Sequence, residues 1–262
     1  MDSLKVKAKL TDEINFEYPP ILYKYRDWEN PYHKGVLTNN ALYMASPRSF
    51  EDIKDCNVPE KFPTKQKLYK FFLEKSRMDH PTWSRKAHRQ FAIYWSIHSP
   101  LANPQRMKSI LEHFNEDFNN RFGVLSMTAN SKNGEMWEKY ANNHKGFCVG
   151  YATDILFKHV GGGGPVQYTE ELPTIDFVKD NFETKHVKNI FYKEKKWAFE
   201  DEYRLHTMWP QVATVEQRNI KLPNECIVEI ILGKFMSKES KDEIKKIVRT
   251  KYPKVKIIED KD

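Results

Sequence analysis

A long helical stretch interrupts a chain that otherwise predicts short strands. Over 64–122, apolar residues recur at three- and four-residue spacing, which is typical of amphipathic helices. In the second half of this stretch the apolar stripe consists of Met107, Ile110, Leu111, Phe114 and Phe118. We expect this helical block to pack on one face of a sheet.

The segments on either side of the block supply that sheet. Alternating or β-branched patterns predict strands at 19–27, 41–46, 123–128, 146–152, 165–169, 197–208, 226–233 and 255–259. Shorter helical patterns lie at 133–143, 174–192 and 237–252. The apolar run at 226–233 is typical of a central strand, and Gly146 suits a left-handed turn after the 133–143 helix.

Together these patterns predict an α+β fold. No internal repeat occurs and no linker separates two domains. We therefore predict a single mixed, largely antiparallel β-sheet domain over 19–262, with a helical insertion at about 64–122 and an N-terminal arm at 1–18.

Composition narrows the class of protein. The chain has 262 residues and a net charge of +7, which is compatible with an anionic ligand or a nucleic acid but requires neither. There is no apolar run of about eighteen residues and no signal-peptide core, so we expect no membrane association. Three widely spaced cysteines, Cys56, Cys148 and Cys226, predict reduced thiols in a cytoplasmic protein and no metal site. The oligomeric state does not follow from the sequence.

One stretch, WAFEDEYRLHTM at 197–208, predicts an unusual strand. One face would be apolar, with Trp197, Phe199, Tyr203 and Leu205. The other face would carry Glu200, Glu202, Arg204 and His206. Two readings are open: Arg204 keeps one carboxylate ionised while the other acts on a ligand, or the face is a cross-strand salt-bridge ladder.

Two further motifs can contact a ligand. Arg26 ends the strand YKYR, where a guanidinium can clamp a phosphate or simply face solvent. In MWEKYANNHKGFC, Trp137 and Tyr140 share one helix face, either to pack in the core or to let Tyr140 stack on a flat ligand. His144 and Lys145 follow in the next turn, where they can hold an anion or be solvated.

The order of these motifs resembles a bacterial family, the domain of unknown function numbered 2971. The matching blocks run from about residue 21 to 250 and are LYKYR, ALYMASPRSFEDIKDC, MWEKYANNHKGFCVGY, VQY, KKWAFEDEYRL and IILG. The family typically shows an Asn-Asp-Pro-Phe-Asp-like run where this chain has residues 50–55. Asp52 and Asp55 persist there, while the Pro-Phe pair does not. The family name implies no activity.

A second resemblance, one of layout alone, is to ADP-ribosyltransferases. In that superfamily an Arg or His on an early strand grips NAD, a Tyr stacks on the nicotinamide, and a late Glu binds the ribose. This resemblance implies Arg26, Tyr140 and either Glu200 or Glu202 as the corresponding residues, with NAD as the substrate. The cofactor-binding residues would then be Arg26, Trp137, Tyr140, His144 and Arg204, and the catalytic residues Glu200, Glu202 and Tyr140.

Three functions remain open at this point. The first is a NAD-dependent ADP-ribosyltransferase or NAD glycohydrolase, such as a bacterial toxin or phage-defence effector. The second is a binding module without catalysis, for a nucleotide, a nucleic acid or a protein acceptor. The third is a metal-dependent nuclease, with Glu194-x-Lys196 and Asp52 or Asp55 around a magnesium ion.

Overall fold

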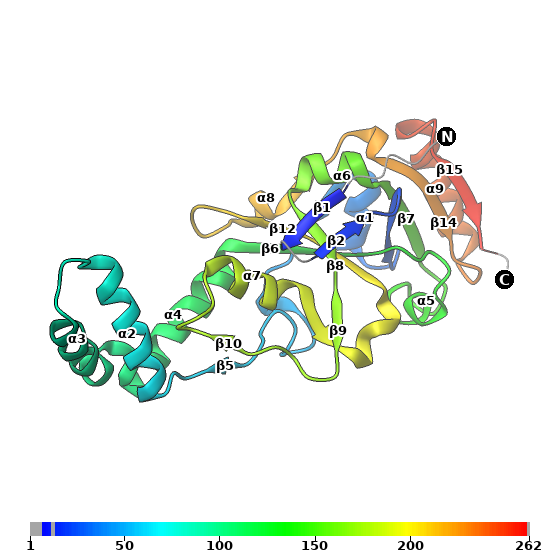
Figure 1. Cartoon of the computed structure of the whole chain (residues 1–262). Coiled ribbons are helices and arrows are strands. Elements are labelled where there is room, and N and C mark those ends of the chain that lie inside the picture. The colour runs from blue at the N-terminus through cyan, green and yellow to red at the C-terminus, as the bar shows by residue number, and fades with distance from the viewer. Residues whose placement is uncertain (1–6, 12–13, 261–262) are drawn as a thin grey trace.

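A seven-stranded sheet forms the body of the protein. The computed structural model describes residues 7–11 and 14–260 (Figure 1). The sheet order is β15 (Lys256–Glu259), β14 (Ile227–Leu232), β7 (Phe147–Ala152), β3 (Ile21–Arg26), β6 (Phe122–Thr128), β12 (Glu202–Met208) and β8 (Gly163–Pro165). Within it β14 and β15 are parallel, while the other neighbours are antiparallel. The predicted α+β class, mixed and largely antiparallel, is confirmed.

The strand at the centre of this sheet is β3. The apolar strand β14 was expected there, but it lies second from one edge, so that expectation was wrong. Its apolar character has another cause, because β14 is covered on both faces: Ile230 is buried in one core cluster and Ile231 in another.

Helices cover both faces of the sheet near β3, β7 and β14. On one face lie α1 (Pro31–Thr38), α6 (Thr153–Val160) and α9 (Lys238–Lys251), whose buried residues join the largest core cluster. On the other face α5 (Gly134–Tyr140) packs on Tyr25, Cys148 and Ile231. Successive residues of β3 therefore point to different environments, which fixes the direction of each of its side chains.

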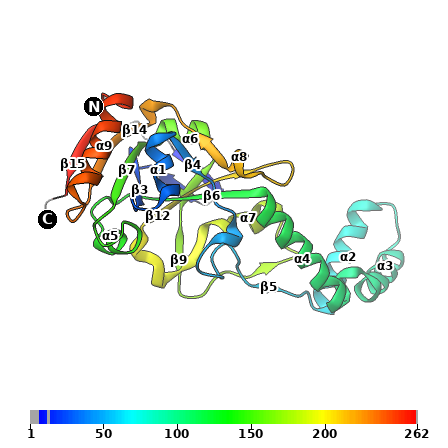
Figure 2. The same ribbon diagram turned by 180° about the vertical axis from the view of Figure 1, so that it is seen from behind.

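The helical block does not cover the sheet. It consists of α2 (Lys65–Asp79), α3 (Arg85–His98) and α4 (Pro104–Arg121), and α4 runs outward from the sheet with α2 and α3 at its far end (Figures 1 and 2). The expectation that this block packs on a sheet face was wrong. The reason is that α2 and α3 bury their apolar residues against each other, around Leu68, Phe72 and Ala92.

Two other segments differ from their predicted structure. In 174–192 the helix α7 (Phe182–Phe191) begins only after Asn181, whose side chain caps it, and β10 (Ile175–Asp176) precedes it. In 197–208 the first residues form a 3₁₀ helix, Lys195–Glu200, and β12 starts at Glu202. Asp201 between them has a left-handed backbone (φ 43°), which breaks the predicted alternation.

Glycine is required at position 146 for a different reason from the predicted one. Positive φ after α5 occurs at Asn142, Asn143 and His144 and not at Gly146. A Cβ on Gly146 would lie 2.2 Å from the carbonyl oxygen of Arg26. Glycine is therefore required there because two backbone segments approach closely.

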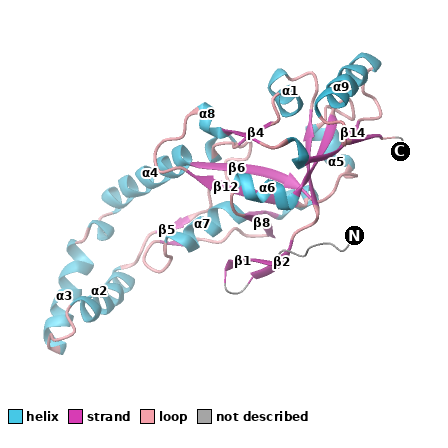
Figure 3. Ribbon diagram, turned by 90° about the horizontal axis from the view of Figure 1, so that it is seen from above, coloured by secondary structure: helices cyan, strands magenta, loops and turns pink. Residues whose placement is uncertain are grey.

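The remaining strands form small two-stranded pairs (Figure 3). These pairs are β1 (Lys7–Thr11) with β2 (Ile14–Glu17), β4 (Ala41–Tyr43) with β13 (Asn219–Lys221), β5 (Glu60–Lys61) with β10, and β9 (Gln167–Thr169) with β11 (Tyr192–Glu194); the short helix α8 (Val215–Arg218) precedes β13. Within the predicted arm, 1–6 and 12–13 lie outside the described residues. The predicted domain boundaries stay a prediction.

Candidate functional site

The sheet divides between the central strand β3 and its neighbour β6. β3 pairs with β7 along its full length, but with β6 it forms a single bridge, between Tyr23 and Thr128. Continued pairing would set Tyr25 opposite Ser126. Instead the Ser126 carbonyl accepts a hydrogen bond from the ammonium group of Lys24. A bond from the Lys24 side chain therefore replaces the backbone hydrogen bonds between β3 and β6 at this point, and a cavity opens in the middle of the sheet.

This cavity has a volume of about 230 Å³ and is lined by charged and aromatic side chains. Its aromatic walls are Tyr23, Tyr25, Phe50, Tyr140 and Trp197. A second cavity of about 670 Å³ lies beside α1, and the two share Lys24, Arg26, Phe50 and Ser126 as lining residues. Two cations therefore stand at the boundary between two cavities, each large enough for part of a small molecule.

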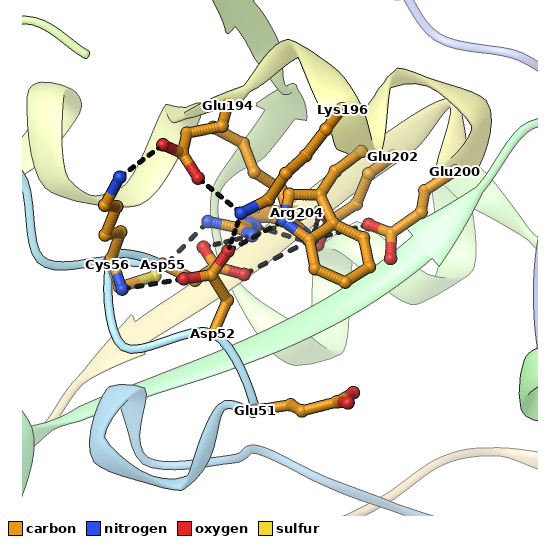
Figure 4. Close-up of polar contacts among 12 residues, drawn as sticks. Glu51, Asp52, Asp55, Cys56, Glu194, Lys196, Glu200, Glu202 and Arg204 are labelled. Atoms are coloured by element: carbon orange, nitrogen blue, oxygen red, sulfur yellow. Dashed lines mark hydrogen bonds and ion pairs between the residues drawn. The ribbon is translucent and has the colours of Figure 1, made fainter. Parts of the chain in front are cut away.

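A buried ion cluster forms one wall of the first cavity. Arg204 is fully buried, and its guanidinium donates to Glu202 (2.8 Å), to Asp55 (2.6 Å) and to the carbonyl of Ile190 (2.7 Å). Figure 4 shows this guanidinium among the carboxylates. Because its donors are directed to fixed acceptors, Arg204 holds Glu202 and Asp55 in place.

Lys193 joins the cluster from β11. Its ammonium lies 2.5 Å from Glu200, 3.2 Å from Glu202 and 3.3 Å from Asp55. Three carboxylates thus share two cations. Burial alone would raise the pKa of Glu202, but Arg204 and Lys193 hold it below its usual value, so Glu202 is ionised at neutral pH.

Glu200 is held more loosely than Glu202. One of its oxygens accepts from the Tyr140 hydroxyl at 2.6 Å and the other faces Lys193. Burial, and then the nearby Glu200 carboxylate, raise the pKa of Tyr140, so the phenol stays protonated and donates. Both side chains line the cavity, so the carboxylate–phenol pair can contact a bound molecule.

The lining of the cavity also includes two cations from β3 without carboxylate ion-pair partners. Among the described residues, no carboxylate forms an ion pair with Lys24 or Arg26, and the Arg26 Nε atom is buried without a hydrogen-bond partner. Burial, reinforced by Arg26, lowers the pKa of Lys24 to about 7. Burial also lowers the pKa of Arg26. Half-buried cations without a carboxylate partner favour an anionic ligand.

The carboxylates of the nuclease hypothesis are already paired with side chains. Asp52 accepts from the Trp197 indole at 2.7 Å and lies 3.2 Å from Lys196. Glu194 lies 2.6 Å from both Lys54 and Lys196. Lysine ammonium groups therefore occupy the space beside these oxygens, as Figure 4 shows for Lys196. No group of three or more metal-ligating side chains occurs within the described part of the chain, and the nuclease stays a prediction.

The structure brings together four of the residues singled out in the sequence. Arg26, Tyr140, Glu200 and Glu202 all line the first cavity. Arg204 lies behind the part of the cavity lining that Glu202 forms, and its guanidinium donates to the Glu202 carboxylate.

It does not bring the other two candidates to the cavity. The Trp137 ring is buried in the core edge-on to Tyr25, at 5.1 Å between ring centres. The His144 imidazole stacks on the other side of Trp137, and it lies 3.7 Å from Asp260. Of the two interpretations offered for Trp137, packing in the core agrees with the structure.

Sequence reasoning missed two lysines of the site. Lys24 was visible in principle, because it precedes Arg26 by two residues and so shares its strand face. Lys193 gave no such signal. It reaches the cluster because β11 pairs with β9, which sets residue 193 opposite Tyr168.

Fold and site together define an α+β protein whose mainly antiparallel sheet divides around a cavity lined by both carboxylates and cations. Residues 136–205 match the model of a protein family of unknown function (DUF2971), which confirms the resemblance to that family. The matched segment contains Tyr140, Lys193, Glu200 and the start of β12 with Glu202 and Arg204, but not β3. Comparisons with curated proteins and with solved structures gave no significant match. No helix in the described parts of the chain has the length and apolar character to cross a membrane.

Proposed function

We propose that the protein binds NAD in the divided sheet and breaks the bond between nicotinamide and ribose, as an ADP-ribosyltransferase or a NAD glycohydrolase. One observation carries this proposal: Lys24 and Arg26 lack carboxylate partners in the described chain, and they line the same cavity as three clustered carboxylates. A ligand that complements both kinds of charge must carry an anionic part and a cationic or hydroxyl-rich part. NAD has both, in its diphosphate and its nicotinamide riboside.

The position of the two cations supports a dinucleotide in particular. Lys24 and Arg26 lie between the two cavities, where a central diphosphate would contact both. A planar guanidinium suits phosphate oxygens, and a half-buried ammonium adds a second point charge. The nicotinamide half would then lie beside Tyr140 and Glu200, and the adenosine half beside α1.

Glu200 is the better candidate for the chemical step. Both oxygens of Glu202 are bound by Arg204, and Lys193 adds a further contact, so Glu202 serves to fix the wall. Glu200 has a phenol and one ammonium as partners and faces the cavity. Tyr140 beside it offers an aromatic ring for the nicotinamide.

The reaction follows from this placement. The bond between ribose C1′ and the nicotinamide nitrogen breaks, and its electron pair stays on that nitrogen. The ribose becomes an oxocarbenium-like cation, as in glycoside hydrolysis. The Glu200 carboxylate stabilises this charge, typically by a few kcal/mol in a water-excluded site. Water or an acceptor hydroxyl then attacks C1′, and its proton passes to the carboxylate. Such an activity would suit a bacterial toxin or a phage-defence effector.

The test compares nicotinamide release by the wild type with release by the variants Glu200→Gln, Glu202→Gln and Glu116→Gln. Purified protein is incubated with NAD, and free nicotinamide is followed by chromatography. We expect Glu200→Gln to lower the rate by roughly 100-fold or more, since it removes the stabilising charge. Glu116→Gln is the control, because this exposed carboxylate on α4 is remote from the cavity. Circular dichroism confirms that each variant is folded.

A binding measurement covers a transferase that waits for its acceptor. Trp197 lines the cavity, so its fluorescence reports NAD binding without turnover. Arg26→Ala should weaken this binding at least about tenfold, the usual effect of losing a charge-assisted contact. Release that persists in both Glu200→Gln and Glu202→Gln contradicts the proposal, as does a protein that neither binds nor cleaves NAD.

A further inference from the structure

The two helices farthest from the sheet carry most of the net charge of the chain. Residues 65–98, which form the α2–α3 hairpin, contain eight lysines and arginines but only two carboxylates, a net charge of +6 against +7 for the whole chain. The basic residues are Lys65, Lys67, Lys70, Lys75, Arg77, Arg85, Lys86 and Arg89. The rest of the protein is therefore nearly neutral. Most of the net positive charge therefore lies on an element that projects from the body (Figures 1 and 3).

The exposed side of α3 combines these charges with aromatic and aliphatic groups. Arg85, Lys86 and Arg89 are exposed in its first turns. One to three turns later the exposed fractions are 54% for Ile93, 55% for Tyr94, 36% for Trp95 and 48% for Ile97. Arg89, Ile93 and Ile97 follow one another at four-residue spacing, so charge and apolar surface are continuous on one face. The hairpin core is built around Leu68, Phe72 and Ala92, and Trp95 contacts it at its edge, with its ring centre 6.2 Å from that of Phe72.

The cations of this face are available to a partner. No ion pair within the described residues involves Arg85, Lys86 or Arg89, whereas Lys75 on α2 is paired with Asp79 at 2.9 Å. The first turn of α3 contains no acidic residue. Arg85 and Lys86 thus stand at the positive end of the helix dipole, where they do not stabilise the helix. Their presence does not follow from the needs of the fold.

We propose that the α2–α3 hairpin binds single-stranded nucleic acid. Arg85, Lys86 and Arg89 would contact backbone phosphates, and Tyr94 and Trp95 would stack on unpaired bases. Exposed aromatic rings beside a basic stripe suit unpaired bases, because every base offers a flat face. A duplex keeps its bases stacked on one another and would leave these rings without a role. The proposal does not depend on NAD cleavage, because binding needs no NAD.

The test measures binding of labelled single strands as a function of salt. Oligothymidylate and oligouridylate of about 20 nucleotides exceed the usual site size and separate DNA from RNA binding. The variant Arg85→Ala/Lys86→Ala/Arg89→Ala should reduce the log–log salt slope by about 2 and weaken binding by about 100-fold at roughly 0.1 M salt. Tyr94→Ala should weaken binding without changing the slope.

The matched control removes the same charge elsewhere. Lys238, Lys246 and Arg249 on α9 are exposed, and their triple alanine variant should bind as the wild type does. Circular dichroism confirms that all variants are folded. Four outcomes overturn the proposal: no binding, binding without salt dependence, an equal loss in the α9 variant, or a preference for duplex or for anionic phospholipid vesicles. None of them bears on NAD cleavage, so the two proposals fail separately.

Discussion

Removal of Arg204 is the most severe single change that the structure predicts for the ion cluster. Its side chain has no solvent exposure and donates to Glu202, Asp55 and the Ile190 carbonyl, with Cys56 Sγ at 3.3 Å. In Arg204→Met the volume is nearly kept, but two buried carboxylates lose their main cation. Breaking a buried pair from one side costs about 3–5 kcal/mol, because a charge is left uncompensated.

A second substitution should restore part of the lost stability. Adding Glu202→Gln to Arg204→Met removes one of the stranded charges. The double variant should therefore be more stable than the two single effects predict, by about 1–3 kcal/mol of coupling free energy. The exposed pair Lys195–Glu170 supplies the comparison, since Lys195→Met should leave the free energy of unfolding nearly unchanged.

Urea unfolding followed by circular dichroism measures these free energies. For a chain of this length, Arg204→Met should also lower the melting temperature by roughly 10 °C. The pKa of Glu202 is held below its unfolded value, so its contribution is present above that value and is lost as pH falls below it. Glu202→Gln should flatten this acid limb. A change below about 1 kcal/mol in Arg204→Met, or strict additivity in the double variant, refutes the reasoning.

Two further predictions concern β3 and its neighbours. Burial lowers the pKa of Lys24 to about 7, so the side chain is half charged at that pH and almost fully charged about two pH units below it. NAD affinity, measured by fluorescence, should fall roughly tenfold from full protonation to one pH unit above the pKa, and Lys24→Arg should abolish this dependence. In Gly146→Ala the new Cβ would meet the Arg26 carbonyl oxygen at 2.2 Å and the Ala141 carbonyl oxygen at 2.9 Å. This variant should lose at least about 1–3 kcal/mol in urea unfolding, while Gly134→Ala, with open space around its Cβ, should not.

The sequence predicted the sheet better than the arrangement around it. Alternating or apolar, β-branched patterns located β3, β6, β7 and β14, because a strand in the middle of this sheet meets a core on one or both faces. The same pattern failed at Trp197–Glu200, where a 3₁₀ helix also buries alternate residues over a short length. A left-handed Asp201 ends that turn, and nothing in the alternation of side chains reveals a single backbone reversal.

Part of the site was predictable, because helix and strand periodicity shows which side chains share a face. Tyr140 and Arg26 follow from helix and strand periodicity, and both line the cavity. The convergence of Glu200 and Glu202 on Lys193 does not follow from it. The two carboxylates lie only seven and nine residues beyond Lys193, but on a 3₁₀ helix and a new strand, and the backbone reversal at Asp201 between them is not visible in the periodicity. The outward path of the helical block was equally hidden, because amphipathic helices show which face is buried but not against what.

The two proposals rest on one difference in how charge is balanced. In the cavity, clustered carboxylates and the cations Lys24 and Arg26 share one lining, so a ligand with a single sign of charge would meet repulsion from part of it. A polyanion has no stable place there. On the α2–α3 hairpin eight cations meet only two carboxylates, so a polyanion is attracted at every phosphate. The same chain therefore offers a small bipolar ligand and a nucleic acid two separate surfaces, and competition between NAD and an oligonucleotide for binding would show that this separation is wrong.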